Sequence, residues 1–478
     1  MGLKSFVLLA VLAFSIRSLI RHRILASQIF PRILLLTPAI AGLLVVVFYG
    51  WTAFTSRHLS EVGSTPYSDL AQAFRHGHLY IESLPSDKLL SLSDPYDPVL
   101  NAPYRYHDMS LYNGKYYLYF GPLPAIFLFL PVQLMGLQMT GYTACFILGA
   151  LLLLTQTFII IKSIGHEVFQ HPVLLSGTIM LLGFGSATPM LLRRPAIYEI
   201  AILSGALFLS CSILCLVLFL RSDASGFKWG CSSIIFAFFA FSSRPSQLVS
   251  VFMISFLFIV VFAQNLRQKA AYLGIATSLV LLICSYNYFR FESIFEFGNH
   301  FQLSGFDTRS FPTFDLDWIK PKIIGDLLTI PEFASTIPWL KFGIPIYATA
   351  LGPTALEPSI GLLIYAPWLI PVFTLFILRS RKIFNADRGL FTTIIFTGIS
   401  AVGSFTVQTV VVPGLTYRYL GDYAPFIFLA AGMFIFHTIL TLKTESYFLR
   451  IMATICLFVT VVVVGLLSFT GYYNPLGY

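Results

Sequence analysis

The sequence has few charged residues: only 11% of its 478 residues are Asp, Glu, Lys or Arg, whereas 57% are hydrophobic. Soluble domains usually carry about 25% charged residues, so this composition excludes an ordinary soluble domain. The short alternating segments of a membrane β-barrel are also missing. Runs of apolar residues recur instead, each long enough to cross a hydrocarbon core of about 30 Å as a helix. The sequence therefore predicts an integral membrane protein built from helices.

Cysteines and nucleotide-binding motifs are scarce as well. All six cysteines lie within apolar runs and none lies in the two long polar segments, so neither disulfides nor a zinc site are expected. No glycine-rich phosphate loop of a nucleotide-binding protein is present. The net charge of +9 falls mostly in short links between apolar runs, which indicates membrane orientation and no nucleic-acid partner.

The length and number of the apolar runs predict an all-α, polytopic transmembrane bundle of about 11–13 helices. The candidate spans are about 33–55, 119–137, 142–162, 173–190, 196–220, 229–243, 246–264, 271–288, 358–378, 389–412, 424–442 and 448–470. The apolar run at residues 6–16 precedes its arginines and lacks a small-residue cleavage site. We expect a short anchor or interfacial helix there and no cleaved signal peptide.

Basic clusters in the short links predict which loops face the cytoplasm. This orientation places a first long loop, about 56–118, a second, about 289–357, and the turn 417–423 on the outer side. We expect a single transmembrane domain, residues 1–478, with two structured outer loops. The candidate spans between the loops are odd in number, although both loops need the same side. Segment 119–137, which is rich in proline, is the first suspect for a segment that does not span, and 229–243 is the second.

Four acids of the first loop are candidates for catalysis or substrate binding. Asp69 lies in "YSDLAQAFRHGHLY", whose apolar stripe predicts a short interfacial helix with the acid near its N-terminal end; a helix cap is the alternative. Asp94 and Asp97, in "SDPYDP", either hold a metal or sugar hydroxyls, or only form turns. Asp108 is either a catalytic or substrate-holding acid or a residue that stabilises the loop.

Aromatic and basic residues surround Asp108. Tyr112 and Tyr116, in "HDMSLYNGKYYLYFGPLP", suit either an interfacial aromatic belt or stacking against a sugar. Arg105 and Lys115 add positive charge to the same region. We therefore expect these side chains to form part of a polar, substrate-binding layer at one membrane face.

Arg193, Arg194 and Glu199 stand between two apolar runs, in "RRPAIYE". On the outer side they break the positive-inside bias. Paired guanidinium groups at a membrane surface bind phosphate or pyrophosphate, and Glu199 is placed to hold one of them; snorkelling to lipid headgroups is the alternative. Further substrate-binding candidates in this layer are Arg244, Arg290, Arg418 and Asp422. Several cations on one face favour an anionic lipid ligand.

The helix-loop layout, the segment "YSDLAQAFRHGHLY" and the turn "LYNGKYYLYFGPLP" together resemble the GT-C superfamily of polytopic membrane glycosyltransferases. The aminoarabinose transferase and protein mannosyltransferase branch is most similar. Specific motifs match only over about residues 60–130. The Asp-Glu pair of the family would fall near Gly63, where only Glu61 is available, and the lysine of its KPP motif has no match at Gly121.

This resemblance implies a glycosyltransferase that moves a sugar from a polyprenyl-phosphate donor to a glycan, lipid or protein acceptor. An acid of the first loop would act as the base, so Asp69 and Asp108 are the catalytic candidates. The resemblance implies no cofactor, although the first-loop acids leave a divalent metal open. It also implies a bacterial plasma membrane location, with the site on the outer face.

Three other functions compete with this interpretation. A transporter or lipid flippase predicts ionisable residues near the bilayer middle, for which Glu199 and His437 are available, but most charges lie at the outer rim. A polymerase or ligase of lipid-linked glycans would share the external loops and arginines. A structural assembly partner without catalytic activity is the third alternative.

Overall fold

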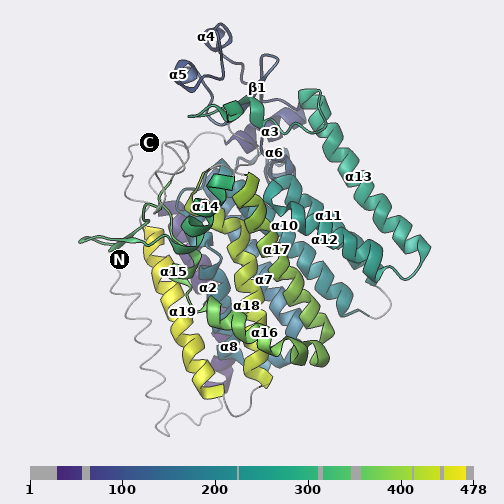
Figure 1. The fold of residues 1–478 in the computed structure, drawn as a ribbon, viewed down its shortest axis with the longest axis vertical. Helices are drawn as coiled ribbons and strands as arrows, with labels where there is room; N and C mark the ends of the chain where they lie inside the picture. Colours follow the sequence, from purple (N-terminus) through teal and green to yellow (C-terminus); the bar gives the residue numbers. More distant parts are fainter. Residues whose placement is uncertain are drawn as a thin grey trace.

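The computed structural model describes residues 29–55, 65–222, 226–310, 316–345, 357–411, 414–441 and 446–469. The helix expected at residues 6–16 and Glu61 lie outside these residues. In the described chain, long helices run side by side, and loops with short strands gather at one end of them (Figure 1). We call this the loop end; of the described residues it carries 65–124, 292–310 and 316–345.

The long helices occur where apolar runs predict them. They are α2 (Ile29–Thr55), α7 (Gly141–Ile164), α10 (Ile197–Leu220), α11 (Gly226–Ser243), α13 (Leu266–Phe291), α16 (Leu369–Ala386), α17 (Arg388–Val411), α18 (Leu420–Thr441) and α19 (Ser446–Ser468). Shorter helices include α8 (Pro172–Gly185), α9 (Thr188–Leu192) and α12 (Leu248–Phe256), which continues as a π-helical turn to Phe262.

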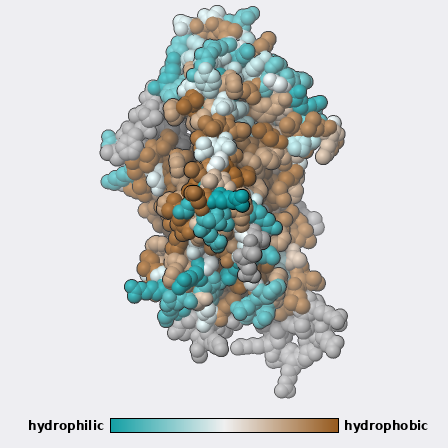
Figure 2. All heavy atoms as spheres, turned by 90° about the vertical axis from the view of Figure 1, so that its right-hand side faces the viewer, coloured by the Kyte–Doolittle hydropathy of each residue, from teal (hydrophilic) through white to brown (hydrophobic). Residues whose placement is uncertain are grey.

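Seven helical segments of the described chain are long and apolar enough to cross a membrane. They are Leu34–Thr55, Gly141–Ile164, Ile197–Leu220, Pro245–Phe262, Leu266–Phe291, Arg388–Val411 and Tyr417–Thr441. The expected all-α, polytopic membrane fold is therefore confirmed. Figure 2 shows one face of the surface, with hydrophilic side chains at the upper and lower ends and mostly hydrophobic side chains between them, apart from a hydrophilic patch near the middle.

Segment 119–137 does not span. It forms only a π-helical turn, η2 (Ala125–Phe129), and α6 (Leu130–Leu134), which together are too short to cross a bilayer. Both pack against α3 (Pro66–Arg75), where the Gln133 amide donates to the Ser68 carbonyl oxygen at 2.8 Å. Without this segment the number of candidate spans between the long loops is even. Both loops accordingly lie at the same end (Figure 1).

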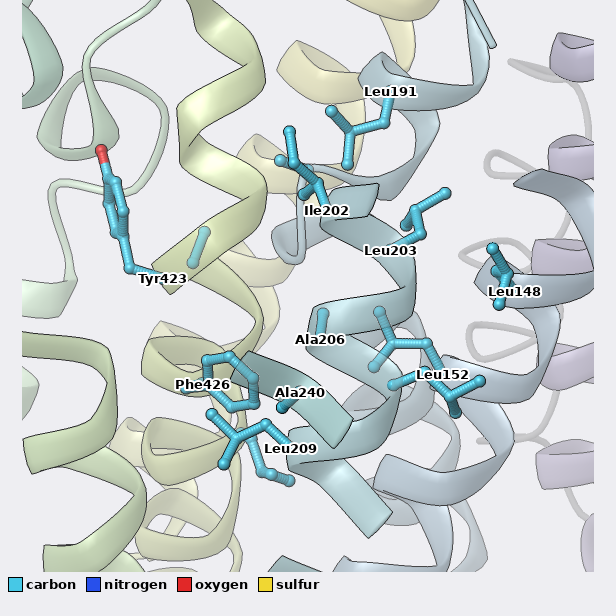
Figure 3. Close-up of a cluster of buried hydrophobic side chains, with 14 of the residues drawn as sticks. Leu148, Leu152, Leu191, Ile202, Leu203, Ala206, Leu209, Ala240, Tyr423 and Phe426 are labelled. Carbon is cyan, nitrogen blue, oxygen red and sulfur yellow. The ribbon is translucent and has the colours of Figure 1, made fainter. Parts of the chain in front are cut away.

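The core centres on α10, which is hydrophobic all round and packs against α7, α11 and α18. Figure 3 shows Ile202, Leu203, Ala206 and Leu209 of α10 among side chains of these neighbours. Phe426 approaches from α18. This packing fixes the loop-end terminus of α10, which carries Tyr198 and Glu199.

A small sheet joins the two long loops. Strands β1 (Met109–Tyr112) and β2 (Lys115–Tyr117) form a hairpin, and β3 (Gln302–Leu303) pairs with the other edge of β1. All pairs are antiparallel, with Ser110 opposite Tyr117 and also opposite Gln302. The hairpin turn is Asn113-Gly114, both at positive φ, which is typical of a type I′ turn.

Several further short elements occur along the chain between the long helices. They are α4 (Asp87–Leu90), α5 (Pro98–Asn101), α14 (Leu316–Leu328), β4 (Glu332–Phe333), β5 (Leu340–Lys341), α15 (Leu362–Tyr365) and the 3-10 turn η9 (Tyr417–Tyr419). Strands β4 and β5 pair as a second, two-stranded sheet. Both sheets fall in the regions predicted as structured loops, where the sequence predicted no strand.

Gly121, directly after the hairpin, allows the chain to touch α11. A Cβ at this position would lie 1.4 Å from the Ser242 carbonyl oxygen. We therefore expect Gly121→Ala to push the segment off α11 and lower the free energy of unfolding by about 1–3 kcal/mol. Thermal unfolding in detergent measures this loss.

The matched control is Gly274→Ala in α13, where a Cβ meets no atom within 4 Å. This substitution should leave the melting temperature unchanged or raise it slightly, because alanine is the better helix former. Equal melting temperatures for the two variants would contradict the close contact at Gly121.

Candidate functional site

An apolar cavity of about 590 Å³ lies between η2, α6, α11 and α13. Its walls are mainly aromatic and aliphatic, with Phe127 from η2, Phe239 from α11 and Leu282 from α13. Phe74 and Leu79, at and after the end of α3, close its loop end. Figure 1 shows α13 at the right, leaning away from the other helices.

The loop end of this cavity also carries a few polar residues. Arg290, Asn287 and Tyr119 line it together. Arg290 is only 3% exposed, and its guanidinium donates to the Leu118 carbonyl oxygen and to Asn287 Oδ1, each at 2.8 Å. It also lies 4.0 Å from the centroid of the Tyr286 ring.

No carboxylate of the described chain forms an ion pair with Arg290, and its Nε lacks a hydrogen-bond partner. A buried charge without a counter-ion is costly. This end of the cavity is therefore suited to an anion that carries an apolar chain.

Asp108 lies at the start of β1 in the left-handed region, with φ of 63°. Aspartate tolerates this conformation better than most residues. Its backbone N–H donates to the Leu303 carbonyl oxygen at 2.8 Å, so β3 fixes its position. Its carboxylate accepts hydrogen bonds from the Tyr198 hydroxyl at 2.7 Å and from Gln302 Nε2 at 3.0 Å. Elements from both loops and from α10 thus orient this acid.

Tyr119 connects Asp108 with the cavity. Its ring lines the polar end of the cavity, and it neighbours Tyr198, whose hydroxyl donates to Asp108. Burial raises the pKa of Tyr119 well above its ordinary value, so the hydroxyl keeps its proton at neutral pH. Tyr119 and Tyr198 thus lie between the cavity and the carboxylate.

Asp69 belongs to a different set of contacts. It lies in the first turn of α3, whose N-cap is Thr65, and its carboxylate accepts a hydrogen bond from the Tyr106 hydroxyl at 3.2 Å. Burial raises the pKa of Tyr106. In the described part of the chain no hydrogen bond joins Asp69 to Asp108.

The other first-loop acids stabilise the loop. Asp94 forms an exposed ion pair with Arg309, 2.6 Å apart, and these hydrogen bonds lower the pKa of Asp94. Asp97 caps α5 by accepting from the Val99 and Leu100 N–H groups. Arg105 donates to the carbonyl oxygens of Pro98 and Ser304 and so ties the two long loops together.

The hairpin side chains pack among other rings. The Tyr112 ring lies 4.7 Å from Phe301, and the Tyr116 ring lies 5.7 Å from Tyr106. Lys115 is exposed and lies over the Tyr80 ring at 4.2 Å. These tyrosines therefore support the loop that carries Asp108.

A second group of charges surrounds η9. Arg418 donates to Glu357 at 2.7 Å, lies 3.9 Å from Glu199 and covers the Tyr198 ring at 4.3 Å. Glu199 is fully buried and accepts from the Ala196 N–H at 3.1 Å. Arg418 thus sits behind the tyrosine that holds Asp108.

Arg193 and Arg194 point to different surroundings. The Arg193 guanidinium lies 4.6 Å from the Phe342 ring and 5.0 Å from the Tyr417 ring. Arg194 is exposed. The two arginines do not form a shared fork around one position in the structure.

Arg244 and Asp422 form a buried ion pair that joins the end of α11 to α18. Arg244 Nε and a terminal nitrogen donate to the carboxylate at 3.0 Å, and Ser246 donates to the same group at 3.0 Å. Gln247 donates to the Asp422 carbonyl oxygen. The charge of Arg244 is therefore satisfied within the protein.

Sequence reasoning singled out neither Tyr198 nor Gln302, which hold Asp108, nor Glu357, which pairs with Arg418. Each lies far along the chain from its partner, so no local spacing pointed to the contact. Among the described residues no group of His, Cys, Asp and Glu side chains is arranged to hold a metal ion.

Removing one partner of the Arg244–Asp422 pair should be costly. We expect Asp422→Asn to lower the free energy of unfolding by about 3–5 kcal/mol, because it leaves a buried guanidinium uncompensated. The double variant Arg244→Met with Asp422→Leu should lose less free energy of unfolding than Asp422→Asn alone. Denaturation in detergent micelles measures both.

Asp94→Asn, which breaks an exposed ion pair, is the matched control. It should lower the free energy of unfolding by less than about 1 kcal/mol. A double variant as unstable as the sum of its single variants would contradict the pair's interdependence.

No protein-family model matches the chain, and no curated protein sequence is similar to it. Several solved structures are similar. The oligosaccharyltransferase of Archaeoglobus fulgidus in the apo form is 11% identical, with a TM-score of 0.45; the match covers 91% of this chain and 56% of that one. The chain thus spans little more than half of that protein's length.

ArnT from Cupriavidus metallidurans bound to undecaprenyl phosphate is 12% identical, with a TM-score of 0.43, and the match covers 91% of this chain and 75% of that one. Archaeoglobus fulgidus AglB with an inhibitory peptide and a dolichol-phosphate is also 12% identical, with a TM-score of 0.43 over 91% of this chain and 56% of that one. Both are GT-C membrane glycosyltransferases, the superfamily that the sequence resembles.

Proposed function

We propose that the chain is a membrane glycosyltransferase that takes a sugar from a polyprenyl-phosphate-linked donor. The supporting observation is the apolar cavity that ends at Arg290 and Tyr119, with Tyr119 beside Tyr198, whose hydroxyl donates to Asp108. A prenyl chain needs an apolar channel, its phosphate needs a cation, and sugar transfer needs a base. The cavity, Arg290 at its loop end and the nearby Asp108 would supply all three.

The donor lipid would occupy the cavity between α11 and α13. Its volume of about 590 Å³ lies within the usual range for ligand sites and accommodates several isoprene units. The lining is aromatic and aliphatic except at the loop end, where Arg290 lies. The lipid phosphate would therefore rest against Arg290, and the sugar would point toward the hairpin that carries Asp108.

In the transfer step, the acceptor hydroxyl gives its proton to the Asp108 carboxylate as its oxygen bonds to the anomeric carbon. The bond between that carbon and the phosphate oxygen breaks, and its electron pair stays on the lipid phosphate. Arg290 stabilises the added negative charge. Tyr198 and Gln302 hold the carboxylate in one orientation during the reaction.

Asp108 is the better candidate base of the two first-loop acids, because Tyr198 and Tyr119 lie between it and the cavity. Asp69 contacts Tyr106 instead. The acceptor, a glycan, lipid or protein, would approach from the loop end. We place this end on the outer face of a bacterial plasma membrane, because Arg221, Arg267 and Lys269 lie at the opposite end of the helices.

The buried Glu199 is the observation that favours a transporter or flippase as the second candidate. Its carboxylate, however, accepts the Ala196 N–H at the start of α10 and lies beside Arg418. These contacts explain its burial without a transport path, so the transferase is the better supported function.

Asp108→Asn keeps the size of the side chain but removes the base. We expect transfer to fall by about 10²–10⁴-fold, the usual contribution of general acid–base catalysis. The measurement is loss of labelled sugar from a panel of polyprenyl-phosphate hexoses and pentoses in membranes containing the protein.

Asp87→Asn, an exposed acid at the start of α4, is the matched control and should retain full transfer. Full transfer by Asp108→Asn would exclude Asp108 as the base, and Asp69→Asn would then be the variant to test. Lipid movement across vesicles that depends on neither acid, without sugar transfer, would favour the flippase.

Arg290→Gln should weaken lipid binding, because it removes a charge-assisted contact to phosphate worth about 1.5–3 kcal/mol. We expect the dissociation constant for undecaprenyl phosphate, measured on the purified protein, to rise about 10–100-fold. Arg309→Gln is the control, because Arg309 is half exposed and pairs with Asp94 and Asp307. Equal affinity in the two variants would exclude Arg290 as the phosphate ligand.

A further inference from the structure

A buried pair of opposite charges lies in α14, away from the cavity and from Asp108. Lys322 is 0% exposed and Asp326, one helical turn later, is 1% exposed. Lys322 Nζ donates to the Gln408 carbonyl oxygen at 2.7 Å, which ties α14 to α17. No hydrogen bond or ion pair joins Asp326 to Lys322, although their spacing along the helix permits one.

Several polar atoms around this pair have no partner. They are both carboxylate oxygens of Asp326, both amide atoms of Gln408, the Thr409 hydroxyl and the Tyr423 hydroxyl. All four residues are at least nine-tenths buried. Leaving a buried polar atom unsatisfied costs about 1–3 kcal/mol, so native proteins rarely leave several together.

These atoms lie in one region, where α14, α17 and α18 meet. Phe405 of α17 packs against the Tyr423 ring at 5.1 Å. Gln408 and Thr409 follow Phe405 by three and four residues, so they share its helix face. Asp326 is the strongest charged neighbour of the Tyr423 hydroxyl. Figure 3 shows this hydroxyl pointing away from the leucines packed around α10.

The chemistry of these groups selects the occupant. Asp326 offers only acceptors when ionised, whereas the Gln408 amide nitrogen is a donor and the hydroxyls of Thr409 and Tyr423 can both donate and accept. A bare metal cation would satisfy the oxygens and leave the amide nitrogen unpaired. Water donates and accepts, so it can satisfy every atom of the set.

We propose that α14, α17 and α18 enclose a water-binding site, in which bound water solvates Asp326 and passes a proton between Asp326 and Lys322. In this transfer the Lys322 ammonium gives a proton to a water molecule, which gives one of its own to the carboxylate. The products are a neutral amine and a neutral acid. No other reactant is needed, and the site is independent of the proposed sugar transfer.

The electrostatic surroundings allow this exchange near neutral pH. Burial raises the pKa of Asp326 to about 7, and burial lowers the pKa of Lys322 to about 8. From η9 and α18, Tyr419 faces Lys322 and Tyr423 faces Asp326, while Asp422 is already paired with Arg244. From α17, Gln408, whose carbonyl oxygen accepts from Lys322, is uncharged.

Infrared difference spectroscopy tests the water site directly. The spectrum of the purified full chain minus that of Asp326→Asn should contain the C=O band of a protonated carboxyl group. We expect this band to disappear as the pH rises, with a midpoint near neutral pH. In D₂O the band should shift promptly, because bound water exchanges. Tyr423→Phe, which removes one hydroxyl, should shift the band without abolishing it. This variant provides the test if Asp326→Asn does not fold.

A band that is missing at acid pH, or one that stays unshifted for hours in D₂O, would overturn the proposal, because the site would then be dry. A band that changes when Na⁺ and K⁺ are replaced by a large organic cation would overturn it in favour of a cation site. A band unaffected by that exchange supports water.

The same pair predicts a pH dependence of stability. The pKa of Asp326 in the folded chain lies above its ordinary 3.8, so the folded state holds an extra proton between about pH 4 and about pH 7. The melting temperature should therefore fall as pH rises through this range. Asp326→Asn should flatten the fall, whereas Asp94→Asn should not, and equal slopes in the two variants would contradict the raised pKa.

Discussion

The free-energy cost of burying a charge beside a membrane core governs the loop end of this protein. Asp422 compensates Arg244, and Glu357 compensates Arg418, within a short stretch around η9. Arg193 instead lies against the rings of Phe342 and Tyr417. These contacts join α11, α18 and the second long loop. Arg290 forms no ion pair with a carboxylate of the described residues, and it lies where an apolar cavity meets the loops.

Much of the helical architecture could be predicted from the sequence, because a long apolar run has few alternatives in a membrane. The run at 142–162 became α7, and the run at 196–220 became α10 with almost the same bounds. Prolines in 119–137 correctly marked the segment that does not span. The small sheet was missed, because strands of two to four residues are too short to show alternation.

The candidate site was harder to predict, because charge pairing depends on tertiary structure. The sequence indicated a layer of acids and arginines at one face, but it could not show that Arg244 and Arg418 are satisfied internally. Nor could it show that Tyr198 and Gln302 orient Asp108. Lys322 and Asp326 drew no attention, because oppositely charged residues four apart usually mark a solvated helix face.

The pairing of β1 with β3 has a consequence for how the protein is made. Asp108 receives a hydrogen bond from Gln302, which lies 194 residues later in the chain. The ribosome synthesises the hairpin and several of the following helices long before it reaches that glutamine. In a nascent chain that ends before β3, Asp108 lacks this hydrogen bond. Its full set of partners can form only after synthesis has passed Gln302.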